Sequence, residues 1–116
     1  MPAAAKRFKL VWFVPAEAAD ATREAVFAAG AGWIGGYDRC SFVSEGTGTF
    51  RGGEGTQPVV GAVGVEERVA ESRIETVVPA ARVAAVVEAL VAAHPYEEVA
   101  YDLYTLAEVA GGGGSA

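Results

Sequence analysis

The sequence has little of the side-chain chemistry on which many enzymes and metal sites depend, because it holds one cysteine, Cys40, and one histidine, His94. A lone cysteine excludes a disulfide within the chain and a thiolate cluster for zinc. Cys40 also lies in no nucleophile motif, and free cysteine usually behaves as a small apolar side chain. We therefore interpret Cys40 as a half-buried strand residue, and the sequence offers no catalytic residue.

Basic residues and long apolar runs are also scarce. Nine lysines and arginines stand against 15 aspartates and glutamates, which gives a net charge of −6. Such a surface repels phosphate backbones, so nucleic-acid binding is not expected. The first apolar run ends at Pro15, too early for a membrane span, and no signal-peptide cleavage pattern follows it. These features predict a cytoplasmic, single-domain protein with no membrane partner.

The most informative pattern that is present is an internal correspondence. The segment VPAEAADATREAVFAAG, from Val14, aligns with VPAARVAAVVEALVAAH, from Val78, at a spacing of 64 residues. Pro15 matches Pro79, and each copy follows an apolar, β-prone stretch. Proline fits the first turn of a helix because its missing N–H has no partner there. Each copy is therefore predicted to form a strand, a proline stop and then a helix.

The two predicted helices differ in the apolar face that they carry. The second has four side chains at i, i+3, i+4 and i+7, the spacing of one helical face: Val83, Val86, Val87 and Leu90. The first has a thinner stripe, made of Ala19, Ala25, Val26 and Ala29. Both helices are thus expected to pack against a sheet, and the small residues of the first would let it pack closely.

A further strand is predicted after each helix. One starts near Tyr37, the last runs from Val99 to Leu106, and the stretch VEERVAESRIETVV between them alternates apolar and charged residues. The order predicts an α+β fold, a ferredoxin-like split βαβ (βαββαβ) whose antiparallel sheet carries both helices on one face. The other face would leave apolar area in water, which favours an oligomer.

Three blocks resemble a known family: YDRCSFVSEGTGTFRGGEG, PVVGAVGVEERVAESRIETVVP and HPYEEVAYDLY. They are similar to the PII-like domain of the YqfO/Nif-three type, which occurs inside longer proteins and in a free-standing form, the form expected here. The HPYE element also resembles the end of the trimeric CutA proteins. The resemblance implies a PII/CutA-like domain over residues 8–106. The ends at residues 1–7 and 107–116 are expected to be flexible, the second because it is rich in glycine and serine. It further implies a homotrimer and no established reaction for the isolated domain.

The two-metal site of the longer relatives lies in their flanking halves and is not transferred to this chain. Arg39 also stands where relatives often have histidine after Tyr-Asp, which weakens a histidine-rich metal site.

The first candidate site is the glycine-rich stretch SEGTGTFRGGEGTQPVVGAVG. No helix is predicted after it and no Gly-Lys-Ser/Thr appears, so it is neither a Walker loop nor a dinucleotide fingerprint. A twisted hairpin with a mobile loop and a ligand-binding loop remain alternatives of equal weight. The PII-like resemblance implies that a ligand would lie in a cleft between subunits. The candidate ligand-binding residues are Glu45, Thr47, Thr49, Arg51 and Glu54.

Those five residues leave the charge of the ligand open. The two threonines and Arg51 suit an anion, whereas Glu45 and Glu54 suit a cation.

The second candidate site is the segment HPYEE, which begins at His94. The favoured interpretation is a structural turn, because the residue before a proline is disfavoured in the α region and a histidine at a helix C-terminus interacts well with the dipole when protonated. The alternative is a metal site in which His94 and Glu97 of one subunit meet groups of the next. Imidazole and carboxylate suit a divalent metal, whose identity stays open.

Three functions follow, in order of preference. The first is a non-catalytic, oligomeric binding or regulatory module for a divalent metal or another small ligand. The second is a structural or interaction module that assembles with a partner protein. The third is a metal-dependent hydrolase, which comes last because the sequence has no nucleophile–base motif.

Overall fold

The computed structural model describes residues 6–109 and has an α+β fold. Its elements are β1 (Arg7–Pro15), α1 (Ala19–Ala28), β2 (Ser41–Arg51), β3 (Glu66–Pro79), α2 (Val83–Ala93) and β4 (Tyr101–Thr105). A short 3-10 turn precedes each helix, η1 at Ala16–Ala18 and η2 at Ala80–Arg82. Most of the ends expected to be flexible, residues 1–7 and 107–116, lies outside the described residues, and β1 begins at Arg7.

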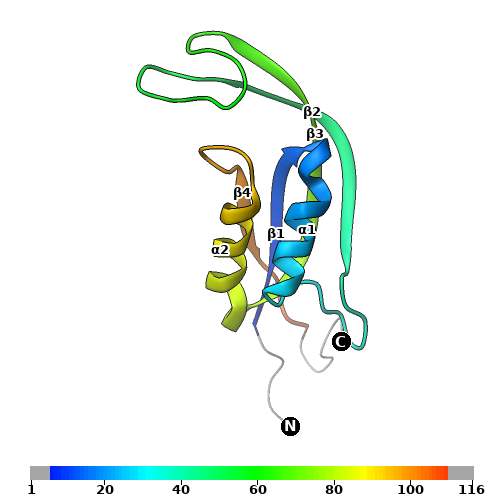
Figure 1. Ribbon diagram of the computed structural model, residues 1–116. Coiled ribbons are helices and arrows are strands. Elements are labelled where there is room, and N and C mark those ends of the chain that lie inside the picture. Colours follow the sequence, from blue (N-terminus) through cyan, green and yellow to red (C-terminus); the bar gives the residue numbers. More distant parts are fainter. Residues whose placement is uncertain (1–5, 110–116) are drawn as a thin grey trace.

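The four strands form one antiparallel sheet in the order β2-β3-β1-β4. This is the order of the predicted split βαβ arrangement, so the predicted fold class is confirmed. The two helices lie side by side on one face of the sheet (Figure 1). The β2–β3 hairpin is longer than β1, and its far end bends across the end of the sheet, above the loop that joins α2 to β4 (Figure 1).

The core lies between the helices and one face of the sheet. Alternate residues of β1 point into it, as period-two geometry requires. The fully buried members are Leu10, Trp12, Val14, Val26, Ile74, Val78, Val86 and Leu90. The predicted face of the second helix is thus largely confirmed: Val86 and Leu90 are buried, and Val83 packs against the core.

The first helix buries a residue that its predicted alanine stripe did not contain. Thr22 is fully buried, and its Oγ1 accepts a hydrogen bond of 2.9 Å from Trp12 Nε1. The same hydroxyl donates to the Ala19 carbonyl at 2.8 Å. Because buried polar groups are costly without partners, this pair joins α1 to β1 at a defined position.

The strand predicted from Tyr37 begins later, at Ser41, so this boundary was wrong. Ile34 and Tyr37 exchange two backbone hydrogen bonds of 2.9 and 3.0 Å, which closes a tight turn instead. Arg39 then adopts a left-handed backbone, with φ at 57°, which a strand does not allow. Its guanidinium pairs with Glu24 on α1 and lies over the Phe27 ring.

None of the helices within residues 6–109 has the length and apolar character that crossing a membrane requires.

Candidate functional site

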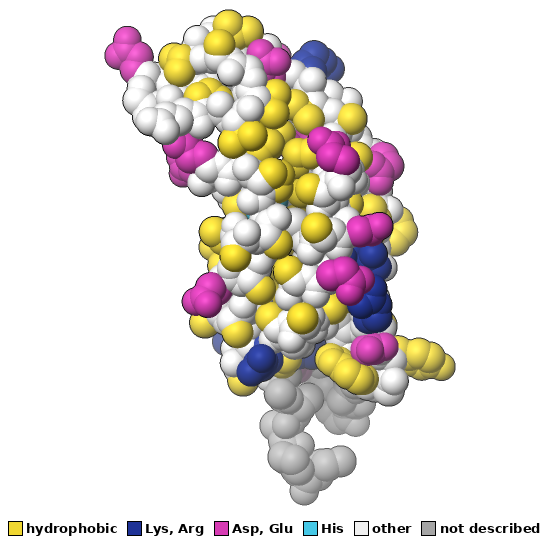
Figure 2. Space-filling view, in the orientation of Figure 1, with side chains coloured by type: hydrophobic (Ala, Val, Ile, Leu, Met, Phe, Trp, Pro, Cys, Tyr) yellow, Lys and Arg dark blue, Asp and Glu magenta, His cyan; other side chains and the backbone are white. Residues whose placement is uncertain are grey.

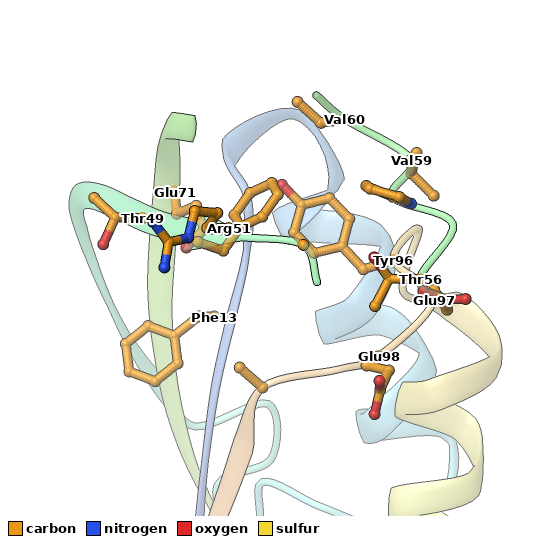
Figure 3. Close-up of a pocket in the computed structure, with 14 residues that line it drawn as sticks. Phe13, Thr49, Arg51, Thr56, Val59, Val60, Glu71, Tyr96, Glu97 and Glu98 are labelled. Atoms are coloured by element: carbon orange, nitrogen blue, oxygen red, sulfur yellow. The ribbon is translucent and has the colours of Figure 1, made fainter. Parts of the chain in front are cut away.

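A pocket of about 260 Å³ lies where the far end of the hairpin meets the turn after α2 (Figure 3). Its apolar walls come from four separate segments and include Phe13, Phe50, Pro58, Val59 and Val60. Its polar lining includes Thr49, Arg51, Glu71, Tyr96, Glu97 and Glu98. The pocket therefore brings together the glycine-rich loop and the HPYEE turn, the two segments that the sequence marked as candidate sites.

Backbone hydrogen bonds close the loop of residues 52–65 over this pocket. The Gly64 N–H donates to the Gly52 carbonyl at 2.8 Å and shuts the loop at its base. The Gln57 N–H donates to Glu97 Oε1 at 3.3 Å and ties the loop to the turn, 40 positions further along the chain. Gly64 has a φ of 82°, a left-handed conformation that glycine adopts without strain. Gly64 thus allows the closure of a loop that contacts the turn after α2.

His94 caps the C-terminal end of α2 and is only 6% exposed. Its Nε2 lies 2.7 Å from the Phe13 carbonyl, and its Nδ1 accepts the Tyr96 N–H at 3.1 Å. A carbonyl oxygen can only accept, so the ring carries its proton on Nε2. Both ring nitrogens are therefore engaged within the chain, and binding a metal would require one of these bonds to break.

The expected metal pair of His94 and Glu97 stays a prediction. Glu97 lines the pocket, whereas His94 does not. Among residues 6–109, no group of three or more His, Cys, Asp or Glu side chains is arranged to hold a metal ion.

Tyr96 presents its hydroxyl inside the protein without a hydrogen-bond partner among the described residues. Its ring packs edge-on against Phe50, with centroids 5.8 Å apart. Burial raises the pKa of the Tyr96 hydroxyl, and the negative charges of Glu71 and Glu17 raise it further. A buried hydroxyl that makes no hydrogen bond carries a desolvation cost of about 1–3 kcal/mol, which a bound donor or acceptor would remove.

Of the glutamate carboxylates that line this pocket, that of Glu71 is the most buried. Burial raises its pKa. The side chain crosses to β2 and lies so close to Gly48 that a Cβ there would overlap the carboxylate. Gly48 therefore makes room for Glu71, a role in packing that is distinct from flexibility.

The candidate ligand-binding residues divide into two groups. Thr49 and Arg51 line the pocket. Glu45 instead accepts hydrogen bonds of 2.9 and 3.0 Å from Ser72 Oγ, while Thr47 and Glu54 are exposed outside the lining. The pocket thus uses the middle of the predicted glycine-rich stretch, between Thr49 and Val60, and neither of its ends.

Sequence reasoning did not select Phe13, Glu71 or Tyr96 as lining residues. In the sequence Glu71 is one of several charged residues in an alternating strand. Only the register, which sets it opposite Gly46 and beside Gly48, distinguishes it from its neighbours.

No known protein-family model matches the sequence. Over 100 residues the chain is 53% identical to a GTP cyclohydrolase 1 type 2 homolog of Halalkalibacterium halodurans, which covers 86% of this chain and 27% of that protein. A protein of the same name in Mycobacterium tuberculosis is 49% identical over 106 residues, 91% of this chain and 28% of the relative. The chain thus spans about a quarter of the length of these relatives.

Solved structures agree with the sequence matches. The crystal structure of a Bacillus cereus protein related to NIF3 superimposes with a TM-score of 0.80 at 50% identity, covering 92% of this chain and 27% of that one. CutA from Synechococcus elongatus superimposes with a TM-score of 0.62 at 19% identity, covering 88% and 78%. The second match concerns the fold alone.

Proposed function

The chain is a CutA-like domain of the YqfO/Nif-three type, and from this premise we propose that it is a non-catalytic, oligomeric binding or regulatory module. The observation that carries the proposal is the pocket between the glycine-rich loop and the HPYEE turn. Small-molecule sites are typically concave and largely apolar, with a few placed polar groups, and this pocket has that composition. Thr49, Arg51 and Glu97 are the predicted site residues that it would use.

The oligomer, a homotrimer by the family resemblance, is supported by the edges of the sheet. β4 is exposed along its length and pairs only with β1, while β2 forms the opposite edge. Unpaired strand edges readily accept another chain. Phe42 and Tyr104 are also largely exposed, 66% and 52%. In the proposed function the protein is a cytoplasmic oligomer, and contacts between its subunits cover these edges.

The same edges favour the second candidate function, an assembly module that meets a partner protein. The hydrolase remains third. The name GTP cyclohydrolase 1 type 2 homolog belongs to relatives about three times as long as this chain, and their activity need not reside in the matching quarter.

A thermal-unfolding screen tests the binding function. The panel holds divalent metals, adenine nucleotides and small organic amines, acids and alcohols. A ligand at 100 times its Kd stabilises the fold by about 2.7 kcal/mol, which raises the unfolding midpoint by several degrees. We expect at least one compound to do so, and Tyr96→Phe to reduce the shift. Tyr37→Phe, at a tyrosine that is 78% exposed and lies outside the pocket and the edge strands, should leave the shift unchanged. If no compound shifts the midpoint, the assembly function replaces the binding function.

A further inference from the structure

The pocket walls carry enough chemistry to indicate what kind of molecule fits, an inference that rests on the proposed binding function. We propose that the pocket takes a small organic cation, with its ammonium group at Glu71 and the Tyr96 hydroxyl and its apolar body against the aromatic and valine walls.

The charge of the lining is the first argument. Glu71, Glu97 and Glu98 line the pocket against a single guanidinium, that of Arg51. Asp and Glu side chains are also spread over the molecular face seen in Figure 2, where Lys and Arg side chains are fewer. Neighbouring carboxylates repel an anion and attract a cation, most strongly where water is partly excluded. An anionic ligand would gain Arg51 and meet three charges of its own sign.

The polar end of the pocket is the second argument. Glu71 is drawn in from solvent, and the Tyr96 hydroxyl is buried without a partner among the described residues. An ammonium group has three N–H donors, and both a carboxylate and a phenol oxygen accept such donors. One ligand head group would therefore satisfy both side chains, which a neutral apolar molecule would not.

The apolar walls set the size and nature of the rest of the ligand. Phe13 and Phe50 come from β1 and β2, and Val59 and Val60 come from the loop and lie above Tyr96 in Figure 3. Aromatic faces attract cations as well as apolar groups, and the Arg73 guanidinium already lies over the Phe13 ring, 5.9 Å from its centroid. At about 260 Å³ the pocket is slightly smaller than the range of about 300–1,000 Å³ usual for drug-sized ligands, so it suits a compact amine.

Three probes have nearly the same shape and differ in charge, so they test whether charge decides binding: 2-phenylethylamine, 2-phenylethanol and phenylacetate. Binding is measured by isothermal titration calorimetry on the full chain at neutral pH. We expect the amine to bind at least tenfold more tightly than the alcohol or the acid. Glu71→Gln removes the charge and should weaken amine binding at least tenfold, while Glu88→Gln, the same change on α2 outside the pocket, should leave it unaltered.

Gly48→Ala provides a second variant that keeps every charge. The added Cβ would displace the Glu71 carboxylate, and the backbone at Gly48 needs no left-handed conformation, so the variant should fold. It should weaken amine binding as Glu71→Gln does.

Two results would overturn the cation inference. In the first, phenylacetate or 2-phenylethanol binds at least as tightly as the amine, and Tyr96→Phe weakens that binding. The proposed ligand pocket would then stand, but its preference for a cation would not. The other is amine binding that neither Glu71→Gln nor Gly48→Ala weakens. If all three probes and the whole thermal panel are without effect, the proposed binding function fails together with the inference.

Discussion

At the scale of single residues, His94 joins three parts of the chain. It ends α2, its Nε2–H donates to the Phe13 carbonyl of β1, and its Nδ1 accepts the N–H of Tyr96 in the turn. The sequence showed an imidazole beside carboxylates, a pattern that a metal site and a structural turn share. The hydrogen bonds favour the structural turn because they occupy both ring nitrogens, and the metal pair of His94 and Glu97 stays a prediction.

Replacing His94 with alanine should lower the free energy of unfolding by about 1–3 kcal/mol, because two part-buried backbone groups would lose their partner. Urea denaturation followed by tryptophan fluorescence measures the change. Glu97→Ala is the comparison, since Glu97 is exposed, and it should cost less. A fully stable His94→Ala protein that has lost the uptake of a divalent metal would instead support the metal site.

Glu71 should make stability depend on pH. Its pKa is raised in the folded protein by burial, so folding favours the protonated acid. That stability is fully present below the unfolded pKa of about 4.5 and is lost as pH rises through the folded pKa. Glu71→Gln should therefore unfold at a higher temperature than the parent at pH 7, and the difference should vanish below pH 4. An equal difference at both pH values would show that the effect is not due to ionisation.

At the scale of elements, the strand–proline–helix repeat was the part of the sequence that predicted best. Pro15 and Pro79 end β1 and β3, and a helix follows each after a 3-10 turn. Periodicity predicted these elements because each one buries a continuous apolar face. The segment after α1 was harder, because its path depends on left-handed residues and on a contact between Arg39 and Glu24, and neither leaves a periodic pattern.

Among the glycines of that segment, Gly32 should tolerate substitution by alanine least. Its φ is 94°, and a Cβ there would come within 2.8 Å of the Phe27 ring. Gly32→Ala should lower the free energy of unfolding by about 1–3 kcal/mol, the usual cost of a strained backbone. Gly36→Ala is the matched control, because open space surrounds that position. Equal stability of the two variants in urea would contradict this account of the turn.

At the scale of the whole molecule, the fold could be predicted and the site only in part. Thr49, Arg51 and Glu97 lie in the pocket because the hairpin bends back onto the turn, and no local pattern encodes that bend. Glu71 and Phe13 join them from the neighbouring strands β3 and β1, where Glu71 pairs with Pro15, two residues beyond Phe13. Contacts that depend on the curvature of a long hairpin are set by the assembled sheet.

Native mass spectrometry of the purified protein tests the central claim most directly, since it counts subunits and bound ligand together. The account predicts a trimer that takes up one amine or other panel ligand per subunit, with uptake reduced in Tyr96→Phe. A monomer, or a trimer that binds nothing from the panel, would contradict it.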